Sequence, residues 1–249
     1  MSRDETFHLY LLIGQSNMAG RGDVEPQDKQ VHPRVFTLDR SCKWLPAADP
    51  IHFDKPIAGV GPGLTFGKTM ADLDPSVRIG LIPCAAGGSP ITVWTPGRYW
   101  DDTASMPYDD AIQRTKLAMT QGVLKGILWH QGESDSLEEN EAALYEDRLV
   151  ALIDALRTDL QAPDVPFIVA TLGDFFIEDY EDHEDHIGGR LVNEALRRIP
   201  QRVKRAACVE SSDLDGKGDG AHFSAEAARE LGRRYAQAFI SQTEPNIAR

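Results

Sequence analysis

The chain has 249 residues, of which 41% are hydrophobic, enough to bury one substantial core. With 26 Lys and Arg against 39 Asp and Glu, its net charge of −13 argues against nucleic-acid binding, which depends on a basic surface. No apolar run approaches the roughly 20 residues of a membrane-spanning helix, so we expect no membrane partner. The start of the chain lacks a secretion signal, which predicts a cytoplasmic protein, although a secreted protein without its signal would look the same.

Two kinds of apolar run alternate along the chain, as in a parallel sheet with helices on both faces. No linker divides the chain, so we predict one α/β domain over residues 1–249. Residues 19–62, rich in Pro, Gly and Asp, are expected to be irregular and to wall one side of the active site. Strands are predicted at residues 7–13, 77–83, 124–129, 166–171 and 206–209, and helices at residues 64–73, 109–121, 137–160, 187–198 and 225–240. For the third helix, Ser136 and Glu139 form the pattern of a capping box.

The most informative motif is GQSNMAG at residues 14–20, directly after the first predicted strand. It places Ser16 at the carboxyl end of the sheet, where open α/β sheets bind their ligands. A serine becomes a good nucleophile beside a base, and DGAH at residues 219–222 offers His222 as that base and Asp219 to orient it. From its position alone Ser16 would sooner be a helix N-cap, but the motifs downstream favour the nucleophile.

Three motifs in order resemble the sialate O-acetylesterase and acetylxylan esterase group of the SGNH hydrolases, which is carbohydrate esterase family six. They are GQSNMAG, WHQGESD at residues 129–135 and DGAHF at residues 219–223. The resemblance implies a three-layer α/β/α sandwich with a flavodoxin-like parallel sheet, no metal or other cofactor, and removal of O-acetyl groups from acetylated carbohydrates. It leaves open whether Glu133 also supports His222. We favour Asp219, because it lies only three residues from the histidine.

Acyl transfer also needs hydrogen-bond donors for the oxyanion. We expect the backbone N–H of Ser16, the backbone N–H of Gly88 and the side-chain amide of Gln131 to supply them. Gly87 is nearly as good a choice as Gly88, since small residues let the backbone approach a ligand closely. Gln131 takes the place of an asparagine found in many SGNH relatives.

Substrate binding is assigned to Gln15, Trp94 and Arg98. An aromatic face stacks on a sugar ring and an arginine binds a carboxylate. The alternative, that Trp94 and Trp100 are core or hinge residues, has about equal weight.

The sequence also allows two other functions and contains two patterns that resemble metal sites. A lipase or thioesterase acting on a non-sugar ester stays open, as does a catalytically idle carbohydrate-binding domain. Residues 213–219 resemble a calcium loop but lack its closing glutamate, and no third ligand pattern accompanies His183 and His186. The three cysteines are odd in number and scattered, so no disulfide framework is expected.

Overall fold

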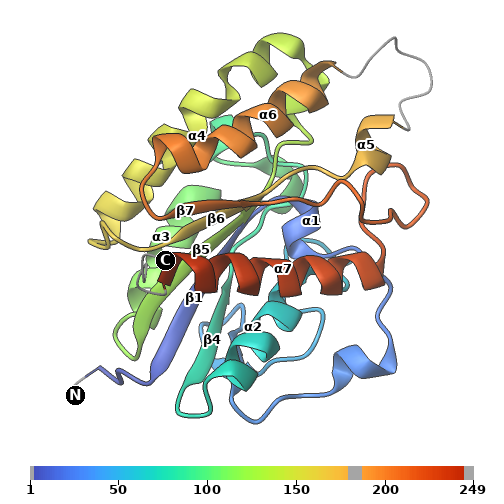
Figure 1. Cartoon of the computed structure of the whole chain (residues 1–249). Helices are drawn as coiled ribbons and strands as arrows, with labels where there is room; N and C mark the ends of the chain where they lie inside the picture. Colours follow the sequence, from blue (N-terminus) through green and yellow to red (C-terminus); the bar gives the residue numbers. More distant parts are fainter. Residues whose placement is uncertain (1–2, 179–186, 244–249) are drawn as a thin grey trace, which may run out of the picture.

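The computed structural model describes residues 3–178 and 187–243, and a seven-stranded sheet runs through the middle of the molecule (Figure 1). All neighbouring strands are parallel except one antiparallel pair, β2 with β3, at an edge. The strands are β1 (Phe7–Gly14), β2 (Val35–Leu38), β3 (Trp44–Pro46), β4 (Arg78–Pro83), β5 (Val123–His130), β6 (Phe167–Ala170) and β7 (Ala206–Val209), in the order β3-β2-β4-β1-β5-β6-β7. The strands β2, β3 and β4 lie on one side of β1, and the later strands β5, β6 and β7 lie on the other. Connections leave β1 and its neighbours in opposite directions at this point, which forms a crevice at the carboxyl end of β1.

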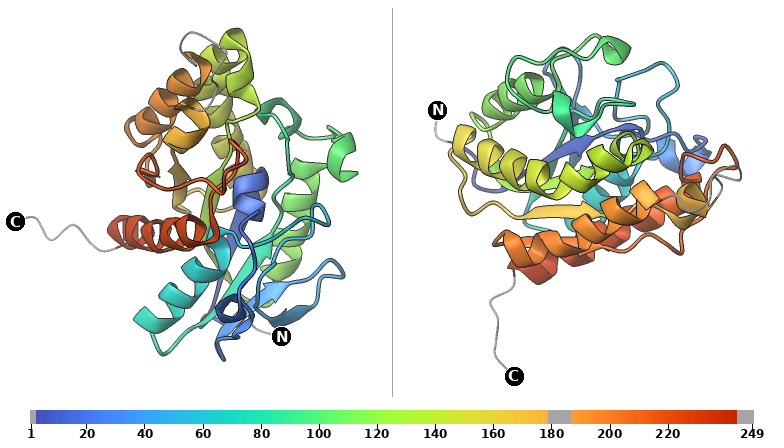
Figure 2. Two further views of the ribbon diagram at one scale, coloured as in Figure 1. Left: turned by 90° about the vertical axis from the view of Figure 1, so that its right-hand side faces the viewer. Right: turned by 90° about the horizontal axis from the view of Figure 1, so that it is seen from above.

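Helices cover both faces of the sheet (Figures 1 and 2). On one face α2 (Pro62–Leu73) and α7 (Ala225–Thr243) pack side by side. The other face carries α3 (Pro107–Ala118), α4 (Glu139–Asp159) and α6 (Ile187–Arg202). The short helices are α1 (Ser16–Ala19) and α5 (Asp174–Glu178), with 3-10 turns at Pro26–Lys29, Ile91–Val93, Asp101–Thr103 and Asp135–Leu137. The predicted α/β/α architecture is confirmed.

The central strand, β1, is largely apolar because helices cover both of its faces. Leu11 and Ile13 of β1 join the core under α3 and α4, whereas Tyr10 and Leu12 join the core under α2 and α7. All four side chains are buried, because a parallel strand with helices on both sides has no solvent face.

Each predicted strand and helix is present, with ends that differ by a few residues. Two expectations were wrong. Residues 19–62 are not wholly irregular, since β2 and β3 lie within them, and both are too short to show a clear period. The capping box is also absent: α4 begins after Glu138 without a side-chain cap, and the Ser136 hydroxyl donates to the Glu133 carbonyl (2.8 Å). His183 and His186 lie outside the described residues.

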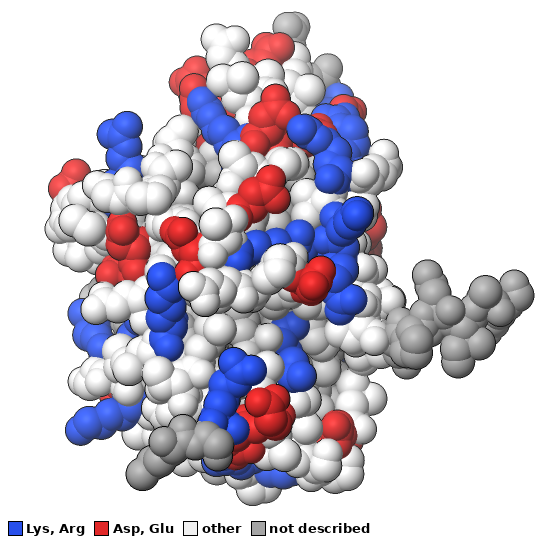
Figure 3. Space-filling view, turned by 90° about the vertical axis from the view of Figure 1, so that its left-hand side faces the viewer, with Lys and Arg blue, Asp and Glu red and all other residues white. Residues whose placement is uncertain are grey.

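The surface agrees with the mixed charge of the sequence. On the face shown in Figure 3, acidic and basic side chains are interspersed and form no large patch of one sign. Within the described ranges, no helix is long and apolar enough to cross a membrane.

Candidate active site

Ser16 is placed by the close approach of β1 to β5. Gly14 has φ of +129°, and a Cβ at this position would lie 2.0 Å from the carbonyl oxygen of His130, so only glycine fits. The next residue, Gln15, donates its backbone N–H to the same carbonyl (2.9 Å). Gln15 is the N-cap of α1 and Ser16 is its first residue, so the serine hydroxyl is not used as a cap. It is left to bind a partner across the crevice.

That partner is His222. The Ser16 Oγ lies 3.0 Å from His222 Nε2, and His222 Nδ1 lies 2.8 Å from Asp219 Oδ2. Two segments that are 206 residues apart in the chain thus form one hydrogen-bonded line from carboxylate to imidazole to hydroxyl. This is the arrangement that activates a serine for acyl transfer.

The loop that carries His222 is ordered by its own hydrogen bonds. Asp219 Oδ1 accepts the backbone N–H groups of Ala221 (3.1 Å) and His222 (2.9 Å). Burial acts to raise the pKa of Asp219, but these bonds and the one from the His222 ring outweigh it and hold the pKa below its usual value. The loop ends at Ser224, whose hydroxyl accepts the backbone N–H of Ala227 and caps α7. Asp219 is therefore held as a carboxylate facing the imidazole.

Glu133 does not touch His222 in this structure. Its Oε1 instead accepts the Asn17 side-chain amide (2.6 Å), and that amide also donates to the carbonyl of Ala221 (3.0 Å). The side-chain oxygen of Asn17, Oδ1, accepts the backbone N–H of Phe223 (3.1 Å), so the Asn17 side chain binds the loop on both sides of His222. Glu133 thus reaches the His222 loop through Asn17 in this structure, and its predicted place among the catalytic residues stays a prediction.

The surroundings of Glu133 differ from those of Asp219. Burial raises the pKa of Glu133 to about 7. His130, whose Nε2 lies 3.7 Å from Glu133 Oε1, is fully buried, and burial lowers its pKa to about 3. His130 is consequently neutral, and the two side chains do not form an ion pair at neutral pH.

Gln131 is not available as an oxyanion donor, which corrects that prediction. It is 0% exposed, and its side-chain nitrogen donates to Gln15 Oε1 (3.1 Å), the Ser89 carbonyl (3.1 Å) and Asp135 Oδ2 (2.6 Å). An amide has two hydrogens, so this set of acceptors already exceeds its donors. The same contacts bury Gln15, which is 4% exposed and whose Oε1 accepts the Gln131 amide. Both glutamines tie the ends of β1 and β5 to the segment after β4.

The glycine loop after β4, Gly87-Gly88, has one free donor. The Gly87 N–H donates to Asp54 Oδ2 (3.0 Å), and the Gly87 carbonyl accepts the Trp100 indole N–H (3.1 Å). The Gly88 carbonyl accepts the Ser134 hydroxyl (2.8 Å). Of the N–H and carbonyl groups of these two glycines, only the Gly88 N–H has no hydrogen-bond partner in the described part of the chain. Of the two glycines, Gly88 is therefore the one that can serve an oxyanion.

An ion pair within residues 19–62 fixes this loop relative to Ser16. Arg21 follows α1, and its Nη2 lies 2.6 Å from Asp54 Oδ2, with both side chains almost fully buried. The Arg21 Nη1 also donates to the carbonyl of Gly20 (2.8 Å). The segment expected to wall the site thus connects the end of the serine helix to the glycine loop.

The two remaining residues predicted to bind substrate, Trp94 and Arg98, differ in their exposure to solvent. Trp94 is 1% exposed, donates its indole N–H to Ser89 Oγ (3.0 Å) and packs edge-to-face on Trp129, so it is a core residue and cannot stack on a sugar. Arg98 is exposed. Trp100 is half-buried and lies beside Gly88. A Cβ atom added at Gly88 would be 3.7 Å from the Trp100 ring. The aromatic cluster was visible in the sequence, but which member faces the site depends on how the chain turns after residue 89.

Comparison with known proteins agrees with this geometry. A family model described as carbohydrate esterase, sialic acid-specific acetylesterase, matches residues 6–241. The chain belongs to this family. The resemblance drawn from the three motifs is confirmed, and the protein is a carbohydrate O-acetylesterase.

Individual relatives align with most of this chain. A probable carbohydrate esterase of Arabidopsis thaliana is 31% identical over 255 residues, which cover 94% of this chain and 90% of that protein. A crystal structure of an Arabidopsis thaliana protein superimposes with a TM-score of 0.80 at 30% identity, over 94% of this chain and 98% of the other. A probable 9-O-acetyl-N-acetylneuraminic acid deacetylase of Escherichia coli is 23% identical, with 78% of this chain and 75% of that protein covered.

Proposed function

We propose that the esterase removes O-acetyl groups from sugar hydroxyls through an acetyl-enzyme on Ser16. The observation that carries this proposal is the hydrogen-bonded line from Asp219 through His222 to Ser16. Asp219 accepts the Nδ1–H of His222, which leaves Nε2 as the nitrogen that can take the serine proton. The proposed catalytic residues are therefore Ser16, His222 and Asp219.

In the first half of the reaction, Ser16 Oγ forms a bond to the carbonyl carbon of the acetyl group while its proton passes to His222 Nε2. The carbonyl oxygen becomes an oxyanion, which the backbone N–H groups of Ser16 and Gly88 would stabilise. Loss of one such donor typically costs about 2.7–4 kcal/mol of transition-state stabilisation. The bond to the sugar oxygen then breaks, and His222 returns the proton to that oxygen.

In the second half, water takes the place of the sugar. His222 Nε2 accepts a proton from the water as its oxygen bonds to the acetyl carbon, and the tetrahedral intermediate forms again. When the bond to Ser16 breaks, the proton returns to Oγ and acetate leaves. Asp219 stays ionised throughout and stabilises the imidazolium that forms twice in each cycle.

The acyl group is expected to be small, because buried side chains and a clamped loop border the serine. Gln131 and the Gly87-Gly88 loop are held by several hydrogen bonds each, so the space beside Ser16 should not widen easily. An extra methylene in a tight pocket costs roughly 1–3 kcal/mol.

The test is a rate comparison on two panels. Acetylated monosaccharides and oligosaccharides should be deacetylated, and chromogenic acetate should react faster than propionate and much faster than butyrate. Ser16→Ala serves as the blank for both panels. Butyrate turnover as fast as acetate turnover, without release of acetate from any sugar, would favour a lipase or thioesterase. No turnover of any ester would favour an idle binding domain.

A further inference from the structure

An ion pair formed by two separate segments borders the glycine loop. Lys55, within residues 19–62, places its Nζ 3.1 Å from Oδ2 of Asp102, which lies in the 3-10 turn Asp101–Thr103. A Cβ atom added at Gly87 would lie 3.5 Å from Lys55 Cε, and one added at Gly88 would lie 3.5 Å from Asp102 Oδ2. Each member of the ion pair is therefore next to one of the two glycines.

The loop that carries Asp102 is held against the glycine loop by Trp100. The backbone groups of Trp100 and Ser105 pair in both directions, with N–H to carbonyl distances of 2.8 Å and 3.2 Å. The indole N–H of Trp100 donates to the Gly87 carbonyl (3.1 Å). The position of Asp102 beside Gly88 is thus fixed by its neighbours, while its side chain stays 55% exposed.

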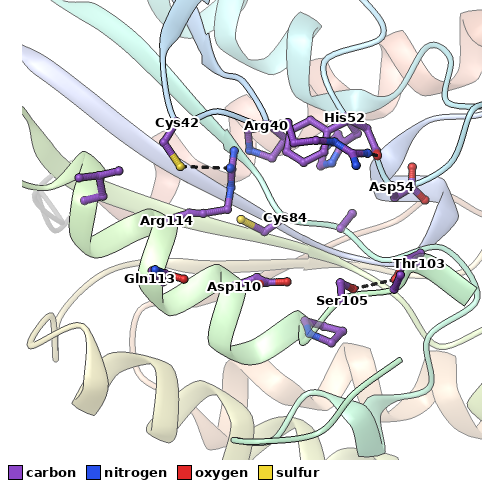
Figure 4. Close-up of a pocket in the computed structure, with 16 residues that line it drawn as sticks. Arg40, Cys42, His52, Asp54, Cys84, Thr103, Ser105, Asp110, Gln113 and Arg114 are labelled. Atoms are coloured by element: carbon purple, nitrogen blue, oxygen red, sulfur yellow. Dashed lines mark hydrogen bonds between the residues drawn. The ribbon is translucent and has the colours of Figure 1, made fainter. Parts of the chain in front are cut away.

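The two ends of this loop face different parts of the molecule. Residues 103–105 line a cavity of about 350 Å³ beside α3, where the Thr103 and Ser105 hydroxyl oxygens lie 2.7 Å apart (Figure 4). Trp100 and Asp102 do not line that cavity. The Asp102 carboxylate therefore belongs to the side of the loop that meets Gly88.

A carboxylate at this place has an electrostatic cost. The Gly88 N–H is the donor assigned to the oxyanion, and a negative charge on Asp102 repels the charge that develops there. Lys55 offsets this repulsion, because it places a positive charge on the same carboxylate. Asp102 Oδ1 has no hydrogen-bond partner among the described residues, so it is free to accept a hydroxyl group.

We propose that Asp102 accepts a hydroxyl of the sugar that leaves, and that Lys55 compensates the charge of Asp102 beside the oxyanion. The inference rests on the proposed function, because it takes Gly88 as the oxyanion donor. In an acetate ester the carbonyl oxygen and the alcohol oxygen are bonded to the same carbon, so the sugar begins close to the Gly88 N–H. Asp102 then favours an alcohol rich in hydroxyls, and Lys55 is a positioning residue that acts through Asp102.

Two acetates separate binding of the sugar from the chemistry of the acetyl group. The first is mono-O-acetylated D-glucose or partially acetylated xylo-oligosaccharides, whichever the wild type deacetylates faster. The second is p-nitrophenyl acetate, whose alcohol part has no further hydroxyl. In Asp102→Ala the ratio of kcat/KM for the sugar ester to that for p-nitrophenyl acetate should fall about tenfold or more, chiefly through KM for the sugar. Asp101→Ala removes an exposed carboxylate of the same turn and should keep the wild-type ratio.

A double variant tests the role of Lys55. Lys55→Gln leaves the Asp102 carboxylate unpaired, and repulsion of the oxyanion should lower kcat on both esters by about threefold to tenfold at low ionic strength. Adding Asp102→Ala to Lys55→Gln should restore most of the lost kcat on p-nitrophenyl acetate. A merely structural role of the ion pair would give no such rescue, because the double variant also lacks the pair.

The outcomes distinguish this inference from the proposed function. The inference is refuted, and the proposed function stands, if the wild type deacetylates sugars but Asp102→Ala and Asp101→Ala show the same ratio. Failure of Asp102→Ala to rescue Lys55→Gln would likewise refute the charge compensation. If the wild type releases acetate from no sugar, the proposed function fails and this inference fails with it.

Discussion

Two acid–histidine pairs lie near each other at the carboxyl edge of the sheet, and they share residue types but not surroundings. In the first pair the side chains of Asp219 and His222 are 38% and 22% exposed and lie 2.8 Å apart. In the second the side chains of Glu133 and His130 are 7% and 0% exposed and lie 3.7 Å apart. In both pairs the acid and the histidine are three residues apart in the sequence. Spacing alone therefore does not decide which pair does chemistry.

The difference comes from hydrogen bonding and burial. Backbone N–H groups and an imidazole face the Asp219 carboxylate, and the pKa of this acid is lowered. Glu133 has one side-chain donor, Asn17, and burial raises its pKa to about 7. The partly exposed pair can pass protons to and from Ser16, whereas the buried pair holds the loop that carries His222. Variants at Ser16, Asp219 and Glu133 separate these two roles, and a variant at Ser134 tests the neighbouring glycine loop.

The largest effect is expected at the serine that the exposed pair serves. Ser16→Ala should lower kcat roughly 10⁴-fold or more, because members of a triad act as a unit. The melting temperature should stay near that of the wild type, since the hydroxyl's described hydrogen bond is the one to His222. A fluorophosphonate should label Ser16 and no other serine, as read by mass spectrometry. An unchanged rate in the variant would exclude Ser16 as the nucleophile.

The next effect compares the two acids directly. Asp219→Asn should lower kcat by roughly 10²–10⁴-fold, because the amide no longer holds His222 in the tautomer that accepts a proton. Glu133→Gln is the matched acid-to-amide control, and should lose less than about tenfold, since a Gln oxygen can still accept the Asn17 amide. Steady-state kinetics on a chromogenic acetate measure both. A much larger loss in Glu133→Gln would assign the orienting role to Glu133.

Stability should respond to pH in opposite senses at the two acids. The pKa of Glu133 rises from 4.5 to about 7 on folding. Between these two pH values the native state therefore binds the proton more tightly than the unfolded state does. Its contribution to stability is complete below about pH 4.5 and is lost as the pH rises to 7. In urea unfolding, the free energy of unfolding of Glu133→Gln should therefore rise relative to that of the wild type between pH 4.5 and 8, by on the order of 2–3 kcal/mol.

For Asp219 the pKa is lowered, so its contribution is present above the unfolded value and is lost as the pH falls. Asp219→Asn should consequently lose stability at neutral pH and recover relative to the wild type in acid. The same slope for both variants would mean that the two carboxyl groups do not differ as described.

The smallest effect concerns the clamp on the glycine loop. Ser134→Ala removes the hydroxyl that donates to the Gly88 carbonyl, and should lower kcat about 3–10-fold with little change in KM. A loosened loop places the Gly88 N–H less well for the oxyanion while leaving ground-state binding intact. Ser241→Ala, which removes a hydroxyl at the far end of α7, is the control. A change confined to KM would show that the loop binds substrate and does not stabilise the oxyanion.

Much of this protein follows from local sequence. The apolar run of β1 predicts a strand buried on both faces, and the motif after it predicts where the serine lies. Asp219 and His222 share one tight loop, so their contact needs no long-range packing. Helix ends were less well predicted, because Ser136 had a better partner in the Glu133 carbonyl than in the helix.

Only the tertiary structure decided the roles that depend on packing between distant segments. The side-chain nitrogen of Gln131 is fully engaged by acceptors that include Gln15 and Ser89, which follow β1 and β4 in the chain. Gly88 was distinguished from Gly87 because Asp54, from a segment with no recognisable motif, takes the Gly87 N–H. Trp94, at the end of the 3-10 turn Ile91–Val93, lies in the core because its ring packs on Trp129 of β5. A sequence states which donors and acceptors a chain has, whereas which of them remain free depends on the neighbours that folding brings to each.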